Sequence, residues 1–396
     1  MKTQPQISFD NIEVAFNSKS NTDLRKMYVI FATLNSNTAV KLGIKMTNLA
    51  FKYRIPVKGL LKKTMFGHFC GGESIQDSQR TIDGLAEYRI GSILDYSVEG
   101  EGDEASYDHT RNEILKTIAK AASSSDMPFS VFKVSGLGDY KIMTKVQGGI
   151  ELTKEEAVSF KKLEDRFNDL CKATFDSNVR ILVDAEESWF QNLIDKMAYS
   201  AMEKYNKETA IVYNTYQMYR HDMLRNLKDA HHEAVSKQYF LGSKLVRGAY
   251  MEKERERAKE KGYASPIQPT KKATDDDYNA ALQFCVNNKQ RIFLVSGSHN
   301  ELSNTILTEL MSLHGLNPDD DRIYFSQLFG MSDNISFNLS NAGYNVAKYV
   351  PYGPVKAVIP YLARRAEENT SIAGQSSREF DLIRKEIARR KAAKKK

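Results

Sequence analysis

The chain has 396 residues, 41% of them hydrophobic, so it is long enough to bury a large core as one or two domains. Its net charge of +7 comes from residues 384–396, which hold eight basic residues and one acidic residue, while the preceding 383 residues hold 49 of each sign. A neutral body argues against a nucleic-acid-binding face, and no apolar run is long enough to span a bilayer.

Cysteine and histidine spacing gives no sign of a disulfide framework or a metal site. Cys70, Cys171 and Cys285 are far apart, and no Cys-x-x-Cys or His-x-x-x-His spacing occurs. The amino terminus has no signal-peptide pattern, and it contains Asp10 and Glu13, which a transit peptide would avoid. We therefore expect a protein of a reducing compartment with no metal. Such a compartment is the cytoplasm or its equivalent inside an organelle.

The first part of the chain is predicted to be helical. Apolar residues at three- and four-residue spacing indicate helices over residues 22–34, 38–53 and 74–90, with a break at Gly71 and Gly72. We assign residues 1–88 to an amino-terminal helical segment, residues 89–383 to the main domain and residues 384–396 to a basic tail. The tail either attracts anionic lipid or forms a solvated, frayed helix end.

Beyond residue 89, short apolar runs alternate with helical patterns. The predicted strands cover residues 91–98, 130–136, 180–185, 210–216, 244–250, 291–297, 322–328 and 345–351. Helices are predicted over residues 153–173, 190–205, 220–238, 274–288, 298–313 and 332–341. This alternation predicts an α/β fold, a TIM-like (βα)8 barrel. An open doubly wound sheet is the alternative, but it usually has fewer strands, and no G-x-G-x-x-G turn occurs.

Each predicted strand carries a polar residue near its carboxyl end, where barrels of this type place their chemistry. The set includes Asp95, Glu99, Lys133, Asp184, Asn214, Gln217, Arg247, His299, Gln327 and Tyr349. One such residue would mean little, because most loop residues only form local hydrogen bonds. A polar residue at every strand end predicts an active site.

A helix predicted after the eighth strand places Tyr361, Arg364 and Arg365 on one face. Two neighbouring guanidinium groups offer forked donors to a single carboxylate. The pattern therefore indicates a clamp for a small carboxylate ligand, and the alternative is a surface helix with internal Arg–Glu pairs.

The order of these motifs resembles the proline dehydrogenase family, whose members are FAD-dependent barrel enzymes, over about residues 91–378. The resemblance is carried by L-D-Y-S-V-E (94–99), V-D-A-E-E (183–187), K-L-V-R-G-A-Y (244–250), G-S-H-N (297–300), Q-L-F-G-M (327–331), Y-V-P-Y-G-P (349–354) and Y-L-A-R-R-A-E-E-N (361–369). Of these, K-L-V-R-G-A-Y and the double-arginine helix are the most specific.

The resemblance implies that FAD oxidises L-proline to 1-pyrroline-5-carboxylate, the first step of proline catabolism to glutamate. It further implies a quinone as electron acceptor and a separate pyrroline-5-carboxylate dehydrogenase as functional partner. The implied location is the cytoplasm or the inner face of a membrane, which in a eukaryote is the mitochondrial matrix side. The substrate residues implied by position are Glu99, Lys133, Asp184, Leu328, Tyr349, Tyr361, Arg364 and Arg365. The implied flavin contacts are Asn214, Lys244, Arg247, Gly248, Ala249, Thr270, Lys271, Lys272, His299, Asn300 and Gln327.

Three other functions are weighed against proline oxidation. The family includes 4-hydroxyproline dehydrogenases, in which a smaller residue tends to stand where this chain has Tyr349, so we expect proline to be preferred. A non-catalytic barrel that binds an amino acid is the second alternative. The third, a hydrolase using Asp184, Glu186 and Glu187, is weaker, because adjacent carboxylates on a strand point to opposite faces.

Overall fold

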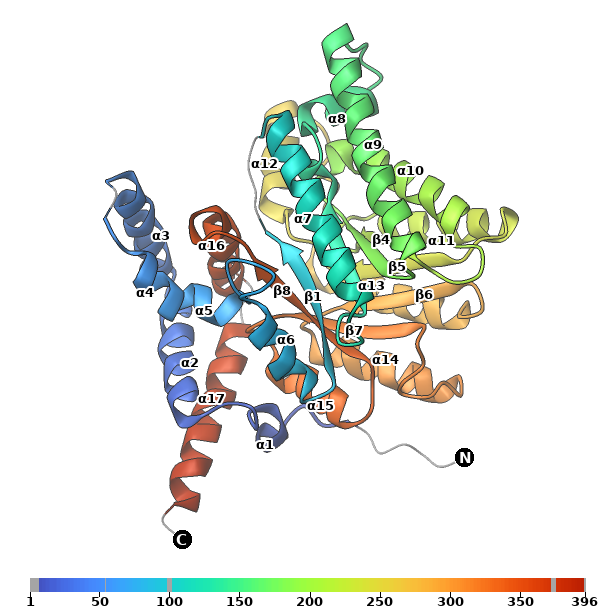
Figure 1. Cartoon of the computed structure of the whole chain (residues 1–396). Helices are drawn as coiled ribbons and strands as arrows, with labels where there is room; N and C mark the ends of the chain where they lie inside the picture. Colours follow the sequence, from blue (N-terminus) through green and yellow to red (C-terminus); the bar gives the residue numbers. More distant parts are fainter. Residues whose placement is uncertain (1–6, 54, 98–101, 372–374, 395–396) are drawn as a thin grey trace.

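The computed structural model describes residues 7–53, 55–97, 102–371 and 375–394, which form a parallel sheet surrounded by helices (Figure 1). The strands are β1 (Ile90–Tyr96), β2 (Phe129–Lys133), β3 (Arg180–Asp184), β4 (Val212–Gln217), β5 (Leu241–Val246), β6 (Ile292–Gly297), β7 (Ile323–Leu328) and β8 (Val346–Tyr352). Their hydrogen-bonded order is β1-β8-β7-β6-β5-β4-β3-β2, and β1 also contacts β2, so the sheet closes nearly into a barrel. The predicted (βα)8 fold is confirmed.

Every connection between consecutive strands contains at least one helix. These helices are α7 (Glu104–Ala122), α8 (Tyr140–Gln147), α9 (Lys154–Asp176), α10 (Ser188–Tyr205), α11 (Met223–Ser236), α12 (Met251–Lys261), α13 (Lys271–Asn287), α14 (Glu301–Leu313) and α15 (Asp333–Asn341). The helix α16 (Val355–Ser371) follows β8 and contacts the helices α2 to α5. The six predicted barrel helices are all present, within three residues at each end. The sequence patterns miss α7, α8 and α12. The last of these is almost entirely charged, so it has no apolar stripe to detect.

The predicted fifth strand, residues 244–250, is misplaced, because β5 begins at Leu241 and ends at Val246. The strand cannot continue, since Gly248 has φ of +128° and a side chain there would meet the ring of Tyr219.

Among the described residues before the barrel, the helices are α1 (Ile12–Ala15), α2 (Asn21–Leu34), α3 (Asn37–Lys52), α4 (Lys58–Lys63), α5 (Met65–Phe69) and α6 (Gln79–Ala86). The helix predicted over residues 74–90 is too long. Residues 74–78 form turns, and Arg89, with φ of +55°, separates α6 from β1. In the described part of the chain, no helix is both long and apolar enough to cross a membrane.

The carboxyl-terminal helix α17 (Gln375–Ala393) packs against α2, and the rings of Tyr28 and Phe380 lie 4.9 Å apart. Part of the predicted basic tail belongs to this helix. Glu386 is buried and pairs with Arg389 and Arg390, while Arg390 also donates to the carbonyl oxygens of residues 16 and 19. The division expected between residues 383 and 384 therefore falls inside a packed helix.

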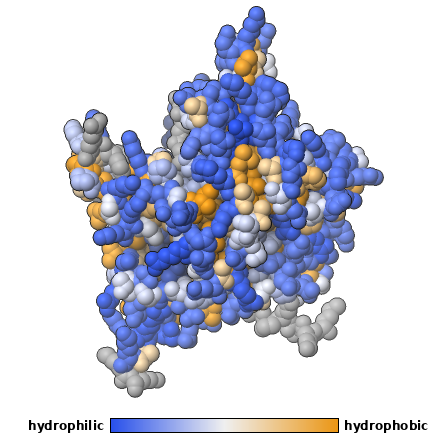
Figure 2. Space-filling model, viewed as in Figure 1, coloured by the Kyte–Doolittle hydropathy of each residue, from blue (hydrophilic) through white to orange (hydrophobic). Residues whose placement is uncertain are grey.

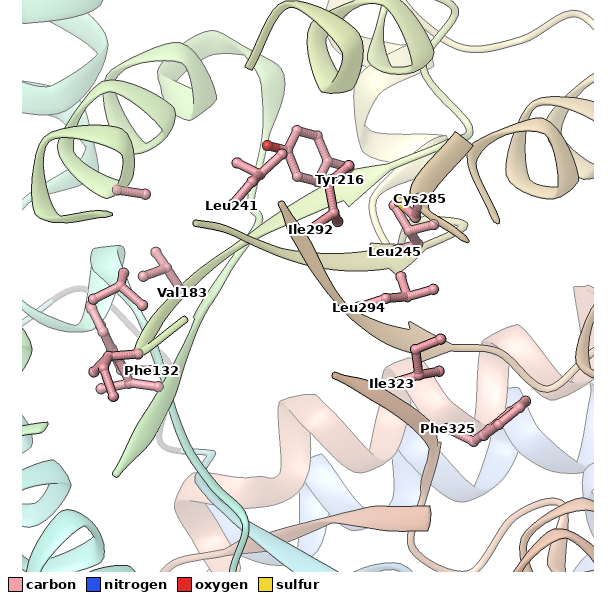
Figure 3. Close-up of a cluster of buried hydrophobic side chains, with 14 of the residues drawn as sticks. Phe132, Val183, Tyr216, Leu241, Leu245, Cys285, Ile292, Leu294, Ile323 and Phe325 are labelled. Carbon is pink, nitrogen blue, oxygen red and sulfur yellow. The ribbon is translucent and has the colours of Figure 1, made fainter. Parts of the chain in front are cut away.

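Side chains alternate along each strand between the barrel interior and the layer under the helices. The inner cluster includes Ile93, Val131, Leu182, Tyr213 and Ala347. The outer layer is larger, and Figure 3 shows part of it, with Val183 on β3, Leu245 on β5, Ile292 on β6 and Phe325 on β7. This alternation decides which polar residues at the strand ends can meet inside the barrel.

Candidate active site

A cluster of charged side chains closes the interior at the carboxyl ends of the strands. Asp95, Lys133, Asp184, Lys244 and Tyr349 come from β1, β2, β3, β5 and β8. Asp95, Lys133, Asp184 and Tyr349 each stand two residues beyond a member of the inner apolar cluster, so alternation points them inward. Side chains from five strands therefore meet in one polar layer.

Lys244 is the centre of this layer. Its Nζ donates to Asp184 Oδ1 at 2.5 Å and to the Tyr349 hydroxyl at 2.6 Å, and it lies 4.5 Å from the centroid of the Tyr349 ring. Tyr349 in turn donates to Asp184 at 3.3 Å. The aromatic ring is thus fixed at its outer end by an ion pair.

Lys133 adds a second cation beside the same carboxylate. Its Nζ lies 3.6 Å from Asp184 Oδ2 and 3.8 Å from Asp95 Oδ2. Burial alone would raise the pKa of Asp184, but Lys244 and Lys133 together hold it below its usual value. Burial lowers the pKa of Lys244 against the attraction of Asp184. Asp184 is therefore an anion that keeps two lysines at the barrel mouth.

The helix α16 brings the predicted clamp to the same end of the barrel. Tyr361 is buried, and the guanidinium carbon of Arg365 lies 5.5 Å from its ring centroid. Leu328, at the end of β7, packs against both the inner cluster that contains Tyr349 and the cluster that contains Tyr361. Arg364 and Arg365 are half-buried, as neighbours of a ligand site would be. The structure thus brings the predicted apolar and cationic residues to one region.

His299 and Arg247 line the rim beside this region. Burial, together with the charges of Lys348, Arg365 and Arg247, lowers the pKa of His299 to about 3, so its imidazole is neutral near pH 7. Its Nδ1 lies 2.8 Å from Ser332 Oγ. Arg247 is held by Asp275, Ser298 and Ser303 at 2.6 to 2.9 Å, which fixes its guanidinium after β5.

Most of the other predicted flavin contacts lie in the loops and helix ends after β5 and β6. Gln327 points outward instead, because it has the parity of Phe325 in the outer layer and alternates with Leu328, which packs against the inner cluster. It is buried, donates to Ser298 O at 3.0 Å and accepts from Ser336 on α15. Asn300 and Thr270 are the N-cap residues of α14 and α13. Lys271 and Lys272 pair with acidic residues four positions along α13 and are exposed, and Gly248 and Ala249 are also exposed.

Asn214 is not brought into this set. Its amide donates at 2.8 Å to Asp195 on α10, outside the barrel, because residue 214 alternates with Tyr213 of the inner cluster. Gln217, at the end of the same strand, has the inward parity and is buried, with its amide donating to Glu186 O at 2.6 Å. Counting positions from Tyr213 would have selected Gln217. The predicted Glu99 lies outside the described residues.

Known proteins resemble this chain over most of its length. A family model described as "Proline dehydrogenase" matches residues 78–378. "Proline dehydrogenase 1, mitochondrial" of Dictyostelium discoideum is 34% identical over 94% of this chain and 73% of its own length. "Hydroxyproline dehydrogenase" of Xenopus laevis is 30% identical over 98% of this chain and 91% of its own length.

The fold also matches solved structures. In a crystal structure of proline utilization A from Bdellovibrio bacteriovorus inactivated by N-propargylglycine, the similar region covers 93% of this chain and 40% of that one. The TM-score is 0.71 and the sequence identity 19%, so this likeness concerns the fold alone.

Proposed function

The chain belongs to the proline dehydrogenase family, and we propose that it oxidises L-proline to 1-pyrroline-5-carboxylate with bound FAD and passes the electrons to a quinone. The observation that carries the proposal is that Leu328 packs against two apolar clusters, one with Tyr349 of the Lys133–Asp184–Lys244–Tyr349 group and one with Tyr361, beside Arg365 on α16. It combines cations for a carboxylate with apolar walls for a small ring.

The substrate is positioned by charge at one end and by packing at the other. Arg364 and Arg365 bind the carboxylate, with Lys133 as a third cation at the same end of the barrel. Leu328, Tyr349 and Tyr361 form the walls for the pyrrolidine ring, in keeping with their packing in two touching clusters. Fixing both ends of a small ligand lowers the entropy cost of reaction, and the buried walls exclude water.

FAD, when bound, would supply the hydride acceptor for oxidation of the substrate ring. The residues present fit such a group, because donors stand at the ends of adjacent strands β4 to β6 and in the loops that follow. They are Gln217, Lys244, Arg247 and His299. In this proposal Gln217 takes the place first assigned to Asn214, whose amide points to α10. The remaining predicted contacts at residues 248, 249, 270–272, 300 and 327 stay proposals.

The proposal extends to partners and location. A quinone receives the electrons at a membrane that the protein contacts peripherally, and a separate pyrroline-5-carboxylate dehydrogenase consumes the product. The location is cytoplasmic or, in a eukaryote, on the matrix side of the mitochondrion, in keeping with the word "mitochondrial" in the name of the Dictyostelium relative.

One alternative substrate is favoured by a specific observation. The Xenopus relative named hydroxyproline dehydrogenase is similar over nearly the whole chain. We prefer proline, because the buried Tyr349 ring is anchored by Lys244 and Asp184 and cannot readily move aside for a 4-hydroxyl group. A non-catalytic barrel that binds an amino acid is the remaining alternative.

An absorbance spectrum tests the central claim. The purified protein should be yellow with about one FAD per chain, and L-proline should bleach the flavin band without oxygen. A colourless protein that takes up no added FAD would overturn the proposal. If 4-hydroxyproline bleaches the flavin and proline does not, the substrate is 4-hydroxyproline and the proposed preference for proline is wrong.

Two variants test the carboxylate clamp. Arg364→Met and Arg365→Met should each lower kcat/KM for L-proline by about 30- to several-thousand-fold, because removing one partner of a buried charged pair costs roughly 2–5 kcal/mol. Flavin content should stay near normal. Lys356→Met, which removes an exposed cation from the same helix, is the matched control and should leave turnover unchanged. Near-normal kcat/KM in both arginine variants would assign the pair to a surface helix.

A further inference from the structure

The helix α3 exposes a line of large apolar side chains. Leu42, Met46, Leu49 and Tyr53, the residue after the helix end, have 56%, 61%, 52% and 65% of their surface accessible. The spacing of four, three and four residues places them on one face. Figure 2 shows apolar side chains gathered on the side of the molecule where Figure 1 places α2 and α3. We call these four residues the α3 stripe.

The opposite face of α3 is already occupied. Val40 is buried and Ile44 packs against the same apolar cluster, and α3 contacts α2 and α16. The stripe is therefore additional to the packing face of the helix. A contiguous exposed apolar surface of this kind marks an interaction site.

The charge around the stripe is of one sign. Between Asp23 and Glu73 the sequence has nine basic residues and no acidic residue. Lys41, Lys45 and Lys52 are exposed, and each directly precedes a stripe residue, so they lie about 100° around the helix and border the stripe. Lys58 and Lys62 are less available, since both pair with Glu73.

We propose that the α3 stripe docks this protein on an anionic lipid surface. A helix with an apolar face bordered by lysines suits the boundary between headgroups and acyl chains. A second copy of the chain fits less well, because a two-fold contact through the stripe would bring the same lysines together. Lipid offers both the apolar layer and the opposite charge.

The position of α3 would bring the membrane close to the proposed active site. The helices α3, α4 and α5 all contact α16, which carries Arg364 and Arg365. A bilayer at the α3 stripe would thus lie beside the proposed site, where a lipid-soluble quinone could approach. Only this link to quinone access rests on the proposed function, and the docking of the α3 stripe on lipid does not. In Figure 1 the carboxyl terminus lies at the far end of α17 from α3, so the basic tail belongs to another surface.

Vesicle binding of the full-length holoprotein tests the proposal. The probe is phosphatidylcholine vesicles with or without phosphatidylglycerol. Leu42→Ser/Met46→Ser/Leu49→Ser and, separately, Lys41→Glu/Lys45→Glu/Lys52→Glu should each weaken binding to anionic vesicles at least tenfold. Proline oxidation with a soluble dye should be unchanged in both.

Two matched controls keep the test specific. Val158→Ser/Leu313→Ser removes exposed apolar side chains elsewhere, and Lys391→Glu/Lys394→Glu reverses charges in the tail, so both should bind vesicles like the wild type. Wild-type binding by the α3 variants would overturn the proposal, as would loss of binding in the tail variant alone. A dimer that the serine variant converts to monomer would assign the stripe to a second copy. Stripe-dependent binding by a protein that cannot oxidise proline would overturn the proposed function and leave the docking surface standing.

Discussion

Two buried lysine–aspartate pairs stand on opposite faces of the same barrel wall. Lys244 and Asp184 meet at 2.5 Å inside it, with 6% and 13% of their side chains exposed. Lys348 and Asp333 meet at 2.6 Å outside it, with 0% and 6% exposed. Lys348 directly precedes Tyr349 on β8, so alternation alone sends one residue to the outer layer and the other to the site.

The partners of the two pairs differ. The inner pair contacts Tyr349 and lies beside Lys133, which are proposed to face the substrate. The outer pair joins separate parts of the fold, because Lys348 also donates to Met331 O at 2.7 Å and Asp333 pairs with Lys19 at 3.2 Å. A lysine–aspartate pair therefore stands at the proposed site on one face of β8, and the other pair joins α15 and the amino-terminal segment to β8 on the opposite face.

The largest expected effect is a loss of stability when the outer pair is broken. Lys348→Met leaves Asp333 buried with Lys19 alone, and removing one member of a buried pair typically costs about 3–5 kcal/mol. We expect the urea midpoint to fall strongly in equilibrium unfolding. Lys244→Met should shift it less, since Lys133 still lies beside the more exposed Asp184. Equal shifts would remove the distinction between the pairs.

The second prediction concerns activity, for which we expect the inner pair to matter more than the outer pair. Lys244→Met removes two charge-assisted hydrogen bonds at the proposed site, and such bonds are worth about 1.5–3 kcal/mol, or about 10- to 150-fold in kcat/KM for L-proline. Steady-state kinetics with a soluble acceptor measures this. The folded fraction of Lys348→Met at low temperature should retain near-normal kcat/KM. A loss there as large as in Lys244→Met would mean that both pairs serve the site.

The third effect concerns pH. Each region also holds a buried carboxyl group with a raised pKa. These are Glu186, near Lys133, and Glu379, against Ser332, and burial raises the pKa of each to about 7. The folded protein therefore keeps the Glu379 proton from the ordinary pKa of 4.5 up to about 7, while the unfolded chain loses it. This contribution to stability is complete below the lower value and is lost as pH rises through the upper one.

Glu379→Gln keeps an oxygen for the Ser332 amide but has no proton to lose. Its free energy of unfolding should fall less than that of the wild type between pH 4.5 and 8, by on the order of 1–3 kcal/mol. Glu186→Gln should in addition change the pH profile of kcat/KM, because Glu186 lies near Lys133. Parallel stability curves for wild type and Glu379→Gln would contradict the assignment.

The barrel could be predicted because its strands are short apolar runs that end in polar residues, and burial on both faces leaves little choice of structure. The site could be predicted only in outline. The resemblance implies residue types and positions, but it takes no account of strand parity, which turns Asn214 toward α10 and gives Gln217 the inward parity. The outer network of Lys348, Asp333 and Glu379 joins β8, α15 and α17, and no local pattern relates residues so far apart in sequence.

The smallest effect tests the end of β8 itself, where Tyr349 faces the interior. Tyr349→Ser should shift the ratio of kcat/KM values toward 4-hydroxyproline, because it opens space beside the substrate ring and leaves a hydroxyl group. The shift should stay below roughly 10²-fold, since pockets discriminate weakly against an added hydroxyl group. Tyr349→Phe is the control, because it removes the hydrogen bonds to Lys244 and Asp184 but keeps the ring. It should lower turnover of both substrates and leave their ratio unchanged. If the phenylalanine variant moves the ratio as far as the serine variant does, the anchored hydroxyl group decides specificity rather than the bulk of the ring. If neither moves it, Tyr349 belongs to the structural support of the inner pair, and the contrast between the two faces of β8 is one of burial alone.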